Sequence, residues 1–385
     1  MRRRYHLHLP GLLYVLLTLV VGIAAANRPN NLLVWVFGAM LSGVLISGIV
    51  SGAMLMGVRG TRADPRRGVV GEPMIVRYAI TNRARMWPAF NLQIEEMARG
   101  RDHNGGLSRA GQWSDGMRPA AGWVLHVGPG DTVHGEAVFF PQRRGRFVFT
   151  RFRVWTTFPF GFVRKSLSFD QRTETLVHPR VLALREDLLG ALTKGGLGGF
   201  RLSSNVGPSE DYFGVREYRP GDSVRQIAWK RMAAGQGVVS IERSSATPPR
   251  LRVVVNLRTE TAQLRVAEGR TSPREMEETA ISIAASVIAL AERQGYEVGL
   301  TVLGVPALRS PVRRGHWHIE KLMATLAAID LDAPRDSEAK LPDADRDRSI
   351  IVAIHPDRAV PSIAPDGAWH LVSTQLATLV RQEKP

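Results

Sequence analysis

Two long apolar runs near the N-terminus constrain this chain more than any other feature of its sequence. Leu9 to Ala26 and Leu32 to Val58 contain no charged residue. At about 1.5 Å per helical residue, each is long enough to cross a hydrocarbon core about 30 Å thick. The polar segment Asn27–Asn31 between them is typical of a tight turn. The pattern therefore predicts a transmembrane hairpin over residues 1–60, with helices at about 9–26 and 32–58.

Arginines cluster on one side of this hairpin. They precede the first run and follow the second: Arg2, Arg3, Arg4, Arg59, Arg62, Arg66 and Arg67. Because Lys and Arg mark the cytoplasmic side of membrane helices, we expect a multi-pass protein of the bacterial inner membrane with both termini in the cytoplasm. The alternative is a secretory signal peptide cleaved after Ala24-Ala25-Ala26. The second run would then still span the membrane, with the rest of the chain on the same side.

Small residues recur along one face of the second run, at Gly43, Ser47 and Ser51 and at Gly48 and Gly52. Such spacing permits close packing of the two helices, or self-association of two copies through their membrane helices. Membrane helices also tolerate glycine without any such role, and the sequence does not separate these interpretations.

Composition narrows the class of the remaining chain. At 385 residues it is too long for one ordinary core, so two or three units are expected. The absence of cysteine excludes disulfides and thiolate metal sites. The formal net charge is +16, and +9 of it lies beyond residue 67, where 43 basic residues face 34 acidic ones. This excess suits an anionic membrane surface or an acidic partner. Nucleic acid is disfavoured, because no long basic run with interleaved aromatic residues stands out.

Residues 68–182 have the pattern of a β-sandwich-like domain. Short runs rich in β-branched and aromatic residues alternate with Gly, Pro and Asn turns. The expected strands are 74–80, 123–127, 133–140, 146–155 and 174–177. Residues 98–122 are rich in Gly, Arg and Ser, and predict a long exposed loop.

Residues 251–385 alternate strands with helices instead. Leu251 to Leu257 predicts a buried strand, and Ser272 begins a helix with Pro273 at its first position and Glu275 placed for a capping box. Gly295 ends that helix. A second helix is expected at 316–329, with further strands at 296–303, 349–354 and 369–373. This alternation predicts an α/β doubly wound domain with a parallel sheet.

The segment 183–250 between them contains a crossover and a distinctive cluster of arginines, acids and aromatic residues. We name as the signature Arg216, Glu217, Tyr218, Arg219, Pro220, Gly221, Asp222, Arg225, Trp229 and Lys230. Guanidinium groups pair with carboxylates and stack on aromatic rings. The cluster therefore either joins the two domains or forms an exposed surface that binds a partner.

The signature closely resembles that of the domain of unknown function 58 family, in which Tyr-Arg-Pro-Gly-Asp is followed by an Arg and by Ile-x-Trp-Lys. Gln142 to Phe147, Phe158 to Phe162 and His178 to Val181 are similar to further landmarks of that family, so the resemblance covers roughly residues 70–250. The membrane hairpin is typical of the family too. Ala228 departs from the family, which usually has Asp before the Trp, and Ala233-Ala234 replaces the usual Ala-Arg.

The resemblance implies a β-rich domain followed by a von Willebrand factor A-like domain, and association with AAA+ ATPases of the MoxR type. It implies no established reaction. A functional A-type domain holds Mg²⁺ with Asp-x-Ser-x-Ser after its first strand, whereas the equivalent positions here are Asn256, Arg258 and Glu260. The later strand ends in Ala353 to Pro356 without the usual Asp-Gly. We therefore expect this metal site to be degenerate, and no cofactor is expected.

The chain lacks a Gly-x-Ser-x-Gly nucleophile motif, a Walker loop and a dinucleotide fingerprint after a strand. The favoured hypothesis is a membrane-anchored, non-enzymatic adaptor or assembly protein that docks other proteins, with a MoxR-type ATPase as the expected partner. A metal-dependent binding domain and an unrecognised cell-envelope hydrolase remain the alternatives.

Overall fold

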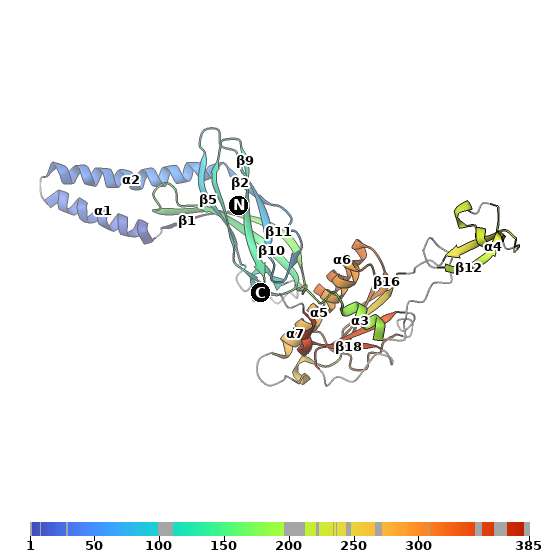
Figure 1. Cartoon of the computed structure of the whole chain (residues 1–385). Helices are drawn as coiled ribbons and strands as arrows, with labels where there is room; N and C mark the ends of the chain where they lie inside the picture. Colours follow the sequence, from blue (N-terminus) through green and yellow to red (C-terminus); the bar gives the residue numbers. More distant parts are fainter. Residues whose placement is uncertain are drawn as a thin grey trace. The chain divides into compact units, whose positions relative to one another are not determined.

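The computed structural model (Figure 1) describes most of the chain. The described residues are 2–7, 9–27, 30–98, 111–195, 212–220, 223–233, 235, 237–243, 248–265, 272–306, 308–342, 349–357 and 368–380. The chain divides into two compact units, unit 1 over Met1–Arg180 and unit 2 over Val181–Pro385. Each unit has its own hydrophobic core.

Unit 1 begins with the two apolar helices, α1 (Leu9–Asn27) and α2 (Asn31–Met56), which lie side by side in Figure 1. The Asn30 side chain caps α2 by accepting a hydrogen bond from the Leu32 amide (2.9 Å), as N-cap residues do. Both helices are long and apolar enough to cross a membrane. α2 ends at Met56 rather than at residue 58, because Val58 already belongs to the next strand.

The small-residue face of α2 is used inside unit 1. Ser47 and Ser51 are fully buried. A Cβ atom on Gly43 would lie 3.2 Å from the Tyr14 hydroxyl of α1, and the Gly48 carbonyl accepts a hydrogen bond from Lys165 of the following domain. The small residues thus allow close packing within one copy of the chain.

Two sheets follow, antiparallel except where the short strands β6 and β3 pair in parallel with β10 and β11, and their inner faces enclose a shared core. The first has the order β1-β11-β10-β5-β8, with β3 beside β11 and β6 beside β10, and the second has the order β2-β4-β9-β7. The strands of the first sheet are β1 (Arg2–Leu7), β3 (Gly68–Val69), β5 (Ala89–Glu96), β6 (Gly111–Gln112), β8 (Ala121–Val127), β10 (Gly145–Thr156) and β11 (Val163–His178). Those of the second are β2 (Val58–Arg62), β4 (Met74–Asn82), β7 (Met117–Arg118) and β9 (Thr132–Pro141). β4 buries every second residue, as expected for a strand with one face on a core.

The sandwich is larger than the sequence predicted. It begins at Val58 instead of residue 68, and β1 adds residues that were interpreted only as a basic membrane flank. The predicted exposed loop at 98–122 is wrong where the structure describes it. Residues 111–122 contain β6, the short helix η1 (Trp113–Asp115), β7 and the start of β8, and Trp113 lies in the core at 4% exposure.

A buried ion pair crosses this core. The Arg62 guanidinium donates to Glu96 Oε1 (2.5 Å), and both side chains are fully buried. The Tyr78 hydroxyl donates to the same oxygen (2.8 Å), and Arg62 also donates to Thr173 Oγ1 and the Phe149 carbonyl. Burial raises the pKa of Glu96, whereas Arg62 and the hydrogen bond from Tyr78 oppose the rise. The pair holds β2, which follows α2 directly, against strands of the other sheet.

Removing one partner of this pair should destabilise unit 1 strongly. In Glu96→Ala the Arg62 charge stays buried without its carboxylate, which costs about 3–5 kcal/mol of unfolding free energy. The matched control is Glu136→Ala, which breaks the exposed Arg77–Glu136 pair (57% and 47% exposed) and should cost less than about 1 kcal/mol. Chemical unfolding of the full chain in mild detergent measures both. Equal losses would contradict the importance of the buried pair.

Unit 2 is built around a mixed five-stranded sheet of order β16-β15-β14-β17-β18. Its strands are β14 (Arg250–Asn256), β15 (Glu297–Leu303), β16 (Leu308–Arg313), β17 (Ile350–His355) and β18 (Trp369–Val372), with β16 antiparallel to the parallel remainder. The helices are α3 (Leu188–Gly195), α5 (Pro273–Arg293), α6 (His316–Ala327) and α7 (Leu376–Leu379). The predicted capping box of α5 is present, because Ser272 and Glu275 exchange hydrogen bonds of 3.2 and 2.9 Å.

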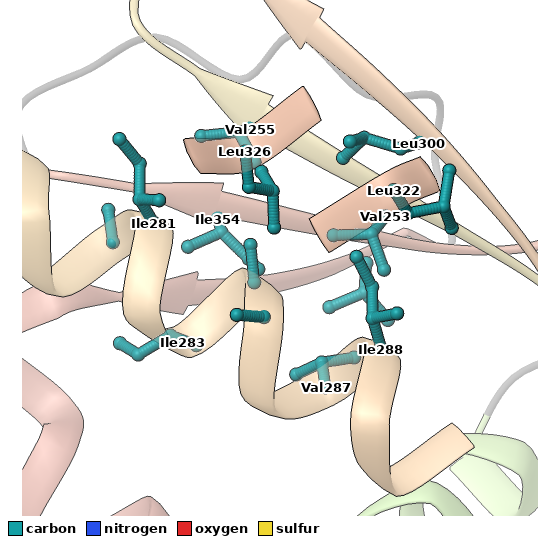
Figure 2. Packing of buried hydrophobic residues seen from close by; sticks show 14 of the residues in the cluster. Val253, Val255, Ile281, Ile283, Val287, Ile288, Leu300, Leu322, Leu326 and Ile354 are labelled. Atoms are coloured by element: carbon teal, nitrogen blue, oxygen red, sulfur yellow. The ribbon is translucent and has the colours of Figure 1, made fainter. Parts of the chain in front are cut away.

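Both long helices of unit 2 contribute to one core cluster. Figure 2 shows side chains of α5, α6, β14, β15 and β17 meeting in it, among them Val253 and Val255. Between these two, Val254 belongs to a second cluster with Leu303, Leu341 and Ile351. In the described part of the chain, this second cluster on the opposite face is therefore packed by the segment that contains Leu341, and no long helix contributes to it. The described residues thus form an α/β unit with a mixed sheet, which differs from the doubly wound arrangement predicted. The reason is local: residues 330–342 carry Pro334 and Pro342 and form turns.

Candidate functional site

The carboxyl ends of β14 and β17 mark the place where the order of the sheet reverses. From β14 the chain moves to β15 on one side, and it later returns to β17 on the other side. Ligands of open α/β sheets bind in the crevice at such a switch point. Here β14 ends at Asn256 and β17 ends at His355. These two residues, both nearly inaccessible to solvent at 1% and 4% exposure, define the first candidate site.

A chain of hydrogen bonds runs outward from Asn256. The Arg258 amide donates to Asn256 Oδ1 (3.3 Å), and Asn256 Nδ2 lies 3.1 Å from His355 Nδ1. His355 Nε2 in turn lies 2.9 Å from Nδ1 of His370, whose side chain is on an exposed residue of β18. Because an amide nitrogen only donates, His355 Nδ1 must accept, which places the His355 proton on Nε2 and makes His370 Nδ1 the next acceptor. The chain thus fixes both tautomers.

His355 is held in its neutral form. Burial, with smaller contributions from the neighbouring His370 and Arg258, lowers its pKa to about 4. A neutral imidazole is what the hydrogen-bond chain requires, since a charged His355 would have no lone pair to accept from Asn256.

This lowered pKa should make unit 2 sensitive to acid. The unfolded chain takes up a proton near pH 6.5, but the folded His355 resists it until about pH 4. The contribution of neutral His355 to the free energy of unfolding is therefore fully present above pH 6.5 and is lost as the pH falls toward 4. From pH 7 to pH 5 the expected loss is about 2 kcal/mol. Chemical unfolding with hydrogen exchange of β14 and β17 measures it, and His355→Gln, which keeps an amide for both partners, should lose that slope. An unchanged slope in this variant would contradict the assignment.

Arg258 lies next to this series of hydrogen bonds. Its Nη1 lies 3.4 Å from the Ala339 carbonyl, and its Nε is buried with no hydrogen-bond partner among the described residues. Burial lowers the pKa of the Arg258 guanidinium, and the charge of Asp336 opposes this shift. A fixed positive charge therefore stands two residues beyond Asn256.

The side chains at this edge do not fit a divalent cation. Hard cations such as Mg²⁺ take several carboxylate and hydroxyl oxygens in a near-octahedral array. The Asn256 oxygen is already bonded to the Arg258 amide, and Glu260 is exposed beside Gln263. Glu277 is fully buried, but its oxygens bind Thr261 (2.9 Å) and Arg335 (2.9 Å). Within the described ranges no three His, Asp or Glu side chains are grouped to hold a metal.

Titration with Mg²⁺ and Mn²⁺ tests this assignment. The full chain should give no saturable heat, because the Arg258 cation repels the ion and Asn256 offers a neutral, occupied oxygen. The double variant Asn256→Asp with Arg258→Ser supplies a carboxylate and removes the cation, so binding should first appear there. Saturable heat with the unaltered chain would overturn the assignment.

The signature forms the second candidate site. It lies on four short elements of unit 2. These are β12 (Tyr212–Glu217), the short helix η2 (Val224–Gln226), α4 (Trp229–Ala233) and β13 (Val239–Arg243), with β12 antiparallel to β13. Among the described signature residues, Arg216 and Tyr218 are half-buried. Those that are exposed are Glu217, Arg219, Pro220, Arg225, Trp229 and Lys230. Gly221 and Asp222 of the signature lie outside the described residues.

Val224 and Trp229 are the most exposed of the large apolar side chains described on these elements. Trp229 is 53% exposed and Val224 is 62% exposed. The backbone beneath them is ordered by the Tyr218 amide, which donates to the Val238 carbonyl (3.0 Å), and by the Ala228 amide, which donates to Val239 (2.9 Å). The described signature therefore presents an aromatic ring and an aliphatic side chain among the exposed arginines.

Ala228 occupies the N-cap position of α4. Its carbonyl accepts from the amides of Arg231 (2.9 Å) and Met232 (3.1 Å), so it is the residue whose side chain would cap the helix. Asp does so well, and Ala cannot. The departure from the resembled pattern thus removes both a cap and a negative charge beside Trp229.

Sequence reasoning did not find the pairing of His355 with His370, or that of Glu277 with Arg335. The first was detectable only in part, because His355 was noted at the end of its strand while His370 lies on a neighbouring strand of unknown register. Glu277 and Arg335 are 58 residues apart, and no periodic pattern links them.

Comparison with known families gives one match. Residues 214–366 match the family model described as "Protein of unknown function DUF58". The matched range starts two residues before the signature and extends through most of the α/β unit, so it reaches further toward the C-terminus than the resemblance at residues 70–250. The upstream landmarks at 142–147, 158–162 and 178–181 lie outside it. No curated protein matches the chain.

Proposed function

We propose that this protein is a membrane-anchored, non-enzymatic adaptor that docks other proteins through the signature surface. The observation that carries the proposal is the exposure of Trp229 and Val224 beside Arg219, Arg225 and Lys230. Trp and Arg are enriched among the few interface residues that supply most binding energy. A partner that covers the Trp229 ring and pairs with the arginines would gain both apolar burial and charge-assisted hydrogen bonds.

An AAA+ ATPase of the MoxR type is the partner proposed, by resemblance to the domain of unknown function 58 family. The hairpin of α1 and α2 would hold the protein in a bacterial inner membrane as a multi-pass protein, with both termini and the signature surface in the cytoplasm, where ATP is present. The arginines that flank the hairpin support this orientation.

The α/β unit is proposed to be von Willebrand factor A-like, with a degenerate metal position. Support comes from the polar switch point between β14 and β17, where Asn256, Arg258 and Glu260 stand after the first strand. In this proposal the sheet edge has lost cation-dependent recognition, and the signature surface serves as the binding site.

Replacing the exposed ring tests the docking surface. Trp229→Ala should weaken binding of the full chain to a purified MoxR-type ATPase by about 2 kcal/mol or more, which is roughly 30-fold in Kd. The matched control is Trp317→Ala on α6, because Trp317 is even more exposed, at 82%, and lies outside the signature. Affinity is measured with and without nucleotide, in bilayer discs.

Two results would contradict the proposal. Absence of any association between the unaltered chain and the ATPase in every nucleotide state would remove the partner. Equal weakening by the two Trp variants would show that the signature surface is not the docking site.

A cell-envelope hydrolase is the second candidate, and one observation favours it. The series of hydrogen bonds from Asn256 through His355 ends at His370, whose exposed imidazole accepts at Nδ1 and therefore carries N–H at Nε2, where it can donate a hydrogen bond to a substrate oxygen. An activity screen against cell-envelope precursors discriminates the two candidates. Hydrolysis that is lost in His370→Gln would favour the enzyme over the adaptor.

A further inference from the structure

Two loops of unit 1 lie where the membrane helices meet the sandwich. One joins β4 to β5 over residues 83–88, and the other joins β10 to β11 over residues 157–162. The Arg83 amide donates to the carbonyl of Gly57, directly after α2 (2.8 Å). The Phe162 ring stacks on Tyr14 of α1, with ring centroids 4.1 Å apart. Both loops are therefore held at the helices themselves.

The contacts with the helices give the depth of the 157–162 loop. At about 1.5 Å per residue, Tyr14 lies about 20 Å along α1 from the end of that helix at Asn27. Gly48, which accepts a hydrogen bond from Lys165 just after the loop, lies about 26 Å along α2 from its start at Asn31. A hydrocarbon core is about 30 Å thick. Both contact points fall within it when the turn of the hairpin sits at the opposite surface.

The 157–162 loop has the side chains and the backbone bonding that this depth requires. Phe160 at its tip is 52% exposed and lies 5.6 Å from the Phe162 ring. The Gly161 amide donates to the Thr157 carbonyl (2.8 Å), and the Phe158 amide donates to Thr156 Oγ1 (3.1 Å). Backbone amides and carbonyls that form hydrogen bonds within a loop can be placed near hydrocarbon at a much smaller free-energy cost than groups without a hydrogen-bond partner.

The 83–88 loop has a different composition, which suits a shallower level. Met86 is 79% exposed and Trp87 is 46% exposed, and Arg83 and Arg85 precede them. The end of α2 lies about 38 Å from its start, beyond the hydrocarbon core and at the level of the headgroups. Trp residues gather at that level, and arginines there are attracted to anionic lipids. Phe90, just after this loop, packs on Phe158 of the other (5.2 Å), so the two loops are joined.

We propose that these loops form a second membrane contact, in which residues 157–162 insert into the acyl region of the leaflet nearest the sandwich and residues 83–88 bind its anionic phospholipid headgroups. The proposal rests on membrane anchoring by the hairpin, which is part of the proposed function, but it is independent of any docking partner. Its consequence is a sandwich seated directly on the bilayer in one orientation.

Site-directed spin labelling tests this contact, because a chain without cysteine gives no background labelling. Single-cysteine variants of the full chain are placed in bilayer discs of neutral and anionic phospholipid. Phe160→Cys and Met86→Cys report on the two loops, and Leu19→Cys in α1 reports on the span. The matched control is Ile75→Cys near the far end of β4, where the apolar side chain is 45% exposed. Nitroxide collision with oxygen is compared with collision with a water-soluble nickel chelate.

The oxygen-to-nickel ratio should be several-fold greater at Phe160 than at Ile75 and close to that at Leu19, with Met86 intermediate. A ratio at both Phe160 and Met86 equal to that at Ile75, while Leu19 remains lipid-exposed, would overturn the second contact and leave the anchor intact. A water-exposed Leu19 would overturn the anchor and the contact together. If Phe160→Cys lowers thermal stability, Met86→Cys alone decides, since its side chain is mostly free of packing.

Discussion

The two apolar helices and the sandwich are joined without a long linker, and this constraint governs the arrangement of unit 1. A single residue separates β1 from α1, and Gly57 alone separates α2 from β2. Because β1 belongs to one sheet and β2 to the other, each sheet of the sandwich is covalently continuous with one helix. A flexible tether would leave the domain free to tumble above the bilayer. Two direct junctions fix it to the helices instead, and in the proposed membrane contact they bring the loops at that end of the sandwich to the level of the lipid.

Fixing the domain in this way requires that β2 itself cannot detach. The Arg62–Glu96 pair prevents detachment, because Arg62 is the last residue of β2 and its charge lies inside the core. Separating β2 from the core would leave the Glu96 carboxylate buried without its partner. Such pairs contribute little net stability but make alternative arrangements expensive. Strand β2 is short, at five residues, so a specific buried interaction holds its register better than apolar packing alone would.

The sequence predicted those parts of the fold that depend on local periodicity. The apolar helices, the alternating strand β4 and the capped helix α5 all follow from residues close together in the chain. Strand β1 could not be predicted, since Arg2 to Leu7 has no apolar alternation and becomes a strand only because β11 extends beside it. The burial of Trp113 could not be predicted either. The sequence around it is rich in Gly and Arg, and tertiary contacts alone place this residue in the core. At the candidate site, Asn256 and Arg258 were found through their position after a strand, whereas the His355–His370 bond depends on the register of β17 and β18.

The two candidate sites of unit 2 differ in how their charges are used. At the sheet edge the polar groups are committed to one another: Asn256 to His355, and Glu277 to Arg335 (2.9 Å). Buried groups that are already paired bind a new ligand only after losing those bonds, which carries a desolvation cost of about 1–3 kcal/mol per group. The described arginines of the signature that are exposed, Arg219 and Arg225, lie at the surface, so a partner reaches them without opening a buried hydrogen-bond network. With Ala228 in place of an acid, no carboxylate at that position competes for them, and the potential around Trp229 is more positive. Recognition at this surface should therefore favour an acidic partner, and the rate of encounter should depend on salt.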